Sequence, residues 1–66
     1  MAVLKVIEVL SNSNTSWEDA TKKAVKEASK SVKNIRSVYV QDQSANVKDG
    51  EVTEFRVNLK ITFEVN

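Results

Sequence analysis

The chemistry open to this chain is limited by two residue types that it lacks. Its 66 residues include no His and no Cys, so the commonest general base, the commonest metal ligand and the thiolate nucleophile are absent. Serines are numerous, but no His is there to activate one of them as a nucleophile. The sequence therefore predicts that the protein is not an enzyme.

Carboxylates offer a second kind of chemistry, because hard cations prefer oxygen ligands. Four acids lie between residues 42 and 54: Asp42, Asp49, Glu51 and Glu54. They do not form the D-x-[DN]-x-[DN]-G pattern of a calcium loop. The sequence thus defines no metal site within one chain, and it leaves open a site assembled across a symmetry axis.

A row of alternating polar side chains is a third candidate, since every second residue of a strand faces the same side. The row contains Ser37, Tyr39, Gln41 and Gln43 from one segment, and Arg56, Asn58 and Lys60 from another. Tyr39 offers an aromatic plane and Arg56 offers charge. We take Ser37, Tyr39, Gln41, Arg56 and Asn58 as candidate ligand-binding residues, with an ordinary solvated sheet face as the alternative.

Two other features favour structural roles. Trp17 lies on the apolar stripe of a predicted helix with Ala20 and Ala24, which favours a core or interface anchor over a ligand-stacking residue. The lysines of the same helix are balanced by acids, and ten basic against nine acidic residues give a net charge of +1. That balance argues against a nucleic-acid or membrane-surface partner.

Four segments must position these side chains. Residues 2–10 are rich in β-branched residues and predict a strand, which a polar loop over 11–15 follows. Helical periodicity predicts a helix that begins at Thr15 or Ser16 and ends near Lys33 or Asn34. Residues 36–47 and 51–65 predict two strands joined by Asp49-Gly50, a strong signal for a two-residue hairpin turn.

The register of this hairpin follows from its turn. A two-residue turn sets Lys48 opposite Glu51, and therefore Val40 opposite Leu59 and Val38 opposite Ile61. Apolar residues then face apolar residues, whereas a slip by one residue would set them against polar ones.

The predicted fold class is α+β, with the order β-α-β-β in one domain of residues 1–66. A three-stranded antiparallel sheet in the order 1-3-2 curls around one helix. Such a short chain has a marginal core, its first strand is apolar on both faces, and a last strand of about 50 Å exceeds a helix of about 27 Å. These features predict a homo-oligomer. No apolar stretch is long enough to span a bilayer, and we expect a cytoplasmic protein.

The chain also resembles the dodecin family along nearly its whole length, through KVIEVL, SWEDATKKAV, the run of residues 28–36 (ASKSVKNIR) and DGEVTEFRVNLKITFEV. The resemblance implies a curved sheet around one helix, a hollow homododecamer, and a non-enzymatic role in binding or storing flavins such as riboflavin or FMN.

Two positions depart from the flavin-binding pattern. The resemblance puts Ser37 where flavin-binding members carry a Trp that stacks on the flavin ring, and Arg56 where they carry a Gln that bonds the ring edge. Arg56 has donors but no acceptor for a ring N–H. We therefore expect weak flavin binding here. The alternative is a flavin-free shell that is structural or that binds another ion or anion.

Overall fold

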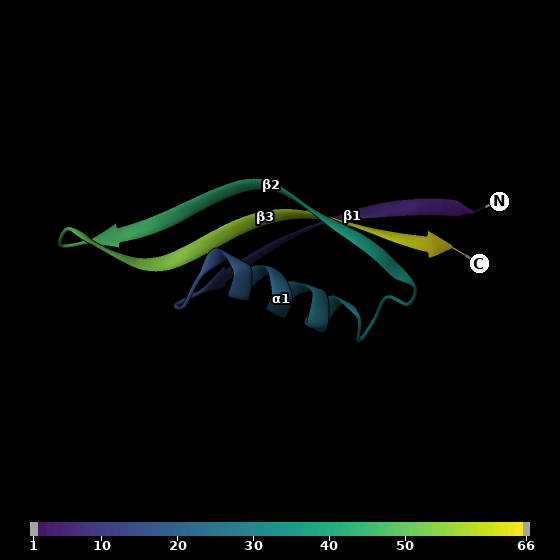
Figure 1. Ribbon diagram of the computed structural model, residues 1–66, viewed down its shortest axis with the longest axis horizontal. Coiled ribbons are helices and arrows are strands. Elements are labelled where there is room, and N and C mark those ends of the chain that lie inside the picture. The colour runs from purple at the N-terminus through teal and green to yellow at the C-terminus, as the bar shows by residue number, and fades with distance from the viewer. Residues whose placement is uncertain (1, 66) are drawn as a thin grey trace.

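The computed structural model describes residues 2–65 and contains one helix lying against one sheet (Figure 1). The elements follow the order β1 (Val3–Ser13), α1 (Trp17–Ala28), β2 (Ile35–Lys48) and β3 (Glu51–Val65). The sheet is antiparallel with the order β1-β3-β2. The predicted β-α-β-β fold is therefore confirmed. Within the described residues, no helix is long and apolar enough to cross a membrane.

The hairpin of β2 and β3 turns at Asp49 and Gly50, which both have positive φ (53° and 79°) as a type I′ turn requires. The predicted register holds at both ends of the hairpin, where Lys48 faces Glu51 and Val38 faces Ile61. Between these ends, residues 42–46 are shifted by one residue against residues 54–58, because irregularities near Gln41 and Thr53 offset each other. This shift was not predicted, and it changes which side chains share a face of the sheet.

The start of α1 is fixed by hydroxyl groups. Ser16 is the N-cap, and its Oγ accepts a bond from the Asp19 backbone N–H at 2.9 Å. The buried Ser13 hydroxyl donates to Asp19 Oδ2 at 2.6 Å. That hydrogen bond, with further help from the Lys23 ammonium, holds the pKa of Asp19 below its usual value. Ser16 is thus the cap, rather than Thr15.

Two predicted boundaries were wrong. The helix ends at Ala28 rather than near Lys33 or Asn34. After it, the N–H groups of Lys30 and Ser31 bond carbonyl oxygens three residues back, as in the tighter turns common at helix ends. The first strand runs on to Ser13, through part of the predicted loop, because these residues still pair with β3.

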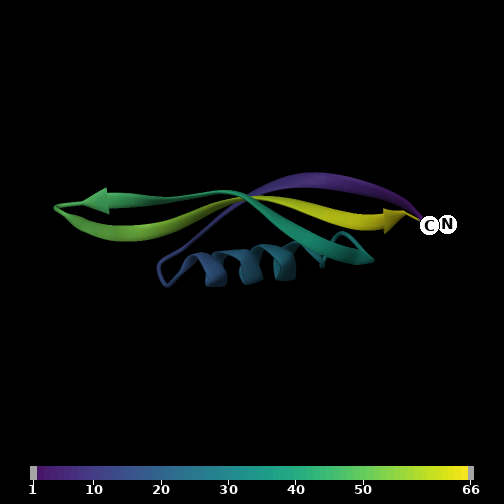
Figure 2. The ribbon, with the colours of Figure 1, turned by 45° about the horizontal axis from the view of Figure 1, so that its top comes forward.

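The core is small compared with the sheet. Its buried apolar residues are Ala20, Ala24, Val57, Leu59 and Ile61. The molecule measures 51 × 20 × 13 Å, whereas a helix of 12 residues is about 18 Å long. The hairpin therefore extends past the helix (Figure 2).

Candidate functional site

The side of the sheet that faces away from α1, here called the open face, carries the even-numbered side chains of β1 and the even-numbered side chains of β3 from Glu54 to Glu64. This assignment follows from strand parity, because the odd-numbered Val57, Leu59 and Ile61 are buried on the helix side. Arg56 and Asn58 therefore lie on the open face, as predicted. From β2 the open face receives Ser37 and Tyr39, which lie opposite Thr62 and Lys60.

The irregularity at Gln41 changes the contribution of β2 beyond this point. Gln41 is the extra residue of the bulge and has no partner in the register. Asp42 and Ser44 then lie opposite Asn58 and Arg56 on the open face. Gln43 lies opposite Val57, so its predicted place on the open face was wrong.

The candidate residues fall into two groups rather than one site. Ser37 lies opposite Thr62, whereas Arg56 lies opposite Ser44. Six residues of β3 separate these two positions, which is about 20 Å at about 3.3 Å per residue. A ring-sized ligand that touches both Ser37 and Arg56 therefore needs two copies of the chain.

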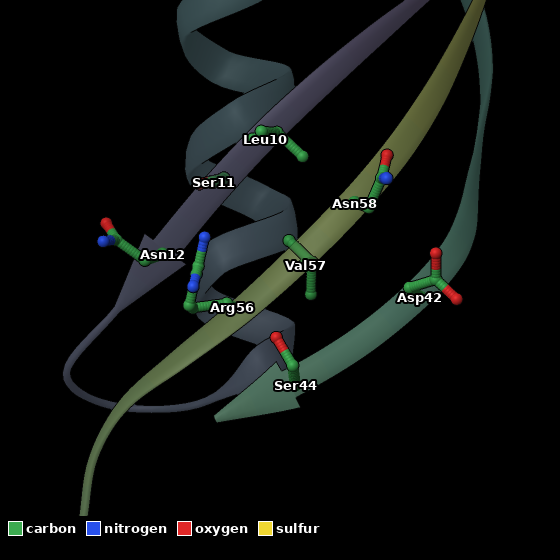
Figure 3. A pocket seen from close by; sticks show the side chains of 8 residues that line it. All are labelled: Leu10, Ser11, Asn12, Asp42, Ser44, Arg56, Val57 and Asn58. Carbon is green, nitrogen blue, oxygen red and sulfur yellow. The ribbon is translucent and has the colours of Figure 1, made fainter. Parts of the chain in front are cut away.

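The second group lines a hollow of about 370 Å³ on the open face (Figure 3), a volume in the range of small-ligand sites. Its walls come from all three strands: Leu10, Ser11, Asn12, Asp42, Ser44, Arg56, Val57 and Asn58. Arg56 lies on the β1 side of β3 in this view, and Asp42 lies on the β2 side. The hollow is rich in oxygen atoms and contains no aromatic side chain.

Asn58 is the unusual member of this group. Its Oδ1 is buried and accepts no hydrogen bond within the part of the chain that the structure describes. A buried acceptor without a partner costs about 1–3 kcal/mol, and such groups in native proteins often mark an ion, a water or a ligand. The Asp42 carboxylate lies opposite Asn58 across the strand pair. An acid and an amide with an unpaired oxygen thus lie at opposite positions of two neighbouring strands that line the hollow.

The other predicted acids lie outside the hollow. Glu54 accepts bonds from Asn12 Nδ2 at 3.0 Å and from Asn46 Nδ2 at 2.8 Å, which ties the three strands together. Asp49 occupies the turn. Residues 2–65 contain no group of three or more His, Cys, Asp or Glu side chains placed to hold a metal. Among the residues that line the hollow, Asp42 is the one acid.

Trp17 anchors the helix to the hairpin, as the sequence predicted. Its indole N–H donates to the Ser44 carbonyl oxygen at 2.9 Å, and its ring meets Phe55 edge-on with centroids 4.9 Å apart. The sequence did not reveal that this contact supports the strand segment carrying Ser44. The parity change at Gln41 also kept Asp42 and Ser44 from being predicted as site residues.

Comparisons with known proteins agree with this architecture. The family model described as Dodecin matches residues 3–66. A protein named calcium dodecin from Mycobacterium tuberculosis is 37% identical over 65 residues, which cover 98% of this chain and 92% of the relative. A crystal structure of that calcium dodecin, described as having a novel calcium-binding site, has a TM-score of 0.83 and covers 97% of this chain and 91% of its own.

A dodecin from Streptomyces coelicolor superimposes with a TM-score of 0.93 at 26% identity, over 98% of this chain and 93% of its own. A Thermus thermophilus dodecin variant gives a TM-score of 0.93 at 23% identity, over 100% of this chain and 98% of its own. The latter likeness concerns the fold alone.

Proposed function

The chain belongs to the dodecin family of non-enzymatic small-ligand-binding proteins, and from this premise we propose that it forms a hollow homododecamer that binds a hard divalent cation, calcium first, in the hollow of the open face. Each subunit is one dodecin-like domain of 66 residues, and we place the assembly in the cytoplasm. The cation is the ion-binding alternative that the sequence left open.

The observation that carries this proposal is the buried Asn58 Oδ1, which lacks a hydrogen-bond partner among the described residues. Calcium takes six to eight oxygen ligands, among them carboxylates and amide carbonyls. Asp42 and Asn58 supply one of each, and the Ser44 hydroxyl lies two residues further along β2. Waters or a neighbouring subunit would complete the shell. The name of the M. tuberculosis relative supports calcium as the first cation to test.

The oligomer has its own physical support. Leu4, Val6 and Leu10 of β1 point to the open face and are 54%, 57% and 70% exposed. A second apolar surface, a groove between β1 and α1, includes Ile7 and Val9. The radius of gyration is 13.5 Å, against about 11 Å for a compact chain of this length. Neighbouring subunits would cover both apolar surfaces.

Flavin is the second candidate ligand, and Tyr39 is the observation that favours it. Tyr39 is 66% exposed and lies on the open face, so its ring could stack on a planar ligand. The Ser37 and Arg56 departures and the 20 Å between these residues support weak binding, at a site shared between subunits.

Calorimetric titration of the purified assembly with calcium chloride tests the proposal. We expect the wild type to bind calcium and Asp42→Asn to lose at least about tenfold in affinity, because a carboxylate is replaced by a neutral amide of the same shape. Asp49→Asn is the matched control, since Asn suits the same turn and position 49 lies outside the hollow. Equal affinities of all three proteins, or no calcium binding by the wild type, would refute the cation site.

Light scattering tests the assembly. Twelve chains of 7.4 kDa give about 89 kDa. A stable mass near that of one chain at micromolar concentration would contradict the proposed oligomer.

A further inference from the structure

We propose that the hollow binds its cation together with an oxyanion, such as phosphate, that the Arg56 guanidinium holds. This inference rests on the proposed cation site and names what completes it. The evidence is the charge that lines the hollow. Asp42 is its one carboxylate and Arg56 its one cationic side chain.

The two charged side chains do not neutralise each other. Arg56 makes no ion pair within residues 2–65. By contrast, Arg36 pairs with Glu64. Asp42 faces Asn58, whereas Arg56 faces Ser44 and Asn12, two residues away along β3. In the hollow, Arg56 lies on the β1 side of β3 and Asp42 lies on the β2 side (Figure 3). Both charges therefore remain available to ligands.

A divalent cation at Asp42 and Asn58 makes this hollow strongly positive. The cation brings two positive charges and Arg56 adds a third, whereas Asp42 removes only one. Like charges at this spacing repel, so Arg56 opposes the binding of a bare cation. A divalent oxyanion between them cancels the excess.

The geometry of the hollow suits such a bridge. One oxygen of an oxyanion can enter the calcium shell at about 2.4 Å, while another accepts from the guanidinium at about 2.8 Å. Such an oxyanion would lie between the β2 side of the hollow, where Asp42 is, and the β1 side, where Arg56 is (Figure 3). The Arg side chain is also the one best shaped for bidentate contact with phosphate or carboxylate.

The Glu54 carboxylate does not compete for this role. Both of its oxygens already accept bonds, one from Asn12 Nδ2 and one from Asn46 Nδ2. Arg56 makes no ion pair with Glu54 or with another acid among residues 2–65, so an oxyanion from solution can pair with it.

Calcium titrations of the intact assembly in two buffers test the inference. The buffers have equal ionic strength, and one contains chloride and the other inorganic phosphate. The calcium concentration stays below that at which calcium phosphate precipitates. We expect phosphate to tighten calcium binding of the wild type by at least about tenfold. Because the coupling between two ligands is reciprocal, calcium must tighten phosphate binding by the same factor. Arg56→Gln should lose this gain, and in chloride it should bind calcium more tightly than the wild type, because the opposing charge is gone.

Arg36→Gln is the matched control, because Arg36 is an exposed arginine that pairs with Glu64 outside the hollow, and it should keep the gain. Light scattering of each variant checks that the assembly is intact. Equal calcium affinity of the wild type in both buffers would overturn the inference and leave the cation site standing. A phosphate gain that survives in Arg56→Gln would also overturn it. Absence of calcium binding in both buffers would overturn the proposed function as well.

Discussion

Replacing Asn58 by Leu should stabilise the calcium-free protein and abolish its cation binding. The Asn58 Oδ1 is buried and accepts no hydrogen bond from the described residues, and such an unpaired acceptor costs about 1–3 kcal/mol. Leu has a similar branched shape at Cγ, removes this acceptor, and would lie opposite Leu10 on β1. For a domain of this size, 1 kcal/mol corresponds to about 4–8 °C in Tm, so we expect Asn58→Leu to melt at least about 4 °C higher in a chelator.

Calcium should change the difference in Tm between the wild type and Asn58→Leu. A ligand that binds only the folded state adds about 2.7 kcal/mol at a hundredfold excess over its Kd. The wild type should therefore gain that amount in excess calcium, whereas Asn58→Leu should gain nothing. Thermal melts of both proteins, at one protomer concentration with chelator or with calcium, measure the two effects.

Lys60→Leu is the matched control, because it adds an equally apolar side chain to the same face of β3 without touching the buried oxygen. If Lys60→Leu raises Tm as much as Asn58→Leu, the gain in Tm comes from an added apolar side chain and not from removal of the unpaired oxygen. If Asn58→Leu lowers Tm in the chelator, Oδ1 has a hydrogen-bond partner in the assembled protein, and this atom is not a free cation ligand.

Three further predictions follow from the fold. Leu59→Ala should lower the free energy of unfolding by about 2–5 kcal/mol, since Leu59 is fully buried. Lys60→Ala should change it by no more than about 0.5 kcal/mol. Similar losses for the two variants in denaturant melts would contradict the face assignment. The pKa of Asp19 is lowered chiefly by the Ser13 hydroxyl. The Asp19 carboxylate therefore stabilises the fold above its unfolded-state pKa, and this stabilisation is lost as pH falls through its folded-state pKa. Asp19→Asn should therefore melt with a shallower dependence on pH below about 4, and a slope like that of the wild type would refute this role. Ser37→Trp should strengthen riboflavin binding, measured by fluorescence quenching, because an indole restores a stacking plane; an unchanged affinity in an intact assembly would show that Ser37 does not face a flavin site.

The hairpin was the most predictable part of the fold, because two local signals agreed. Asp49-Gly50 fixes a two-residue turn, and the apolar residues of β3 alternate from Phe55 to Val65. The end of the helix was less predictable, since the apolar stripe continues through Val32 while the hydrogen bonds of Lys30 and Ser31 already reach only three residues back. Polar residues at the end of β1 suggested a loop, yet their backbone still pairs with β3.

The site was only partly predictable, because its composition depends on a bulge. Parity on β3 placed Arg56 and Asn58 correctly on the open face. One extra residue at Gln41 moves Gln43 to the helix side and brings Asp42 and Ser44 to the open face, and the sequence carries no Gly or Pro near Gln41 to signal this change. The unpaired oxygen of Asn58 depends on tertiary packing and has no signature in the sequence.

A crystal structure of the assembly grown with calcium, with anomalous diffraction recorded for the metal, tests the cation site most directly. We expect an anomalous peak in the hollow, about 2.3–2.6 Å from both Asn58 Oδ1 and the Asp42 carboxylate. A hollow without such a peak, with Asn58 Oδ1 bonded to a neighbouring subunit or to water alone, would contradict the cation site.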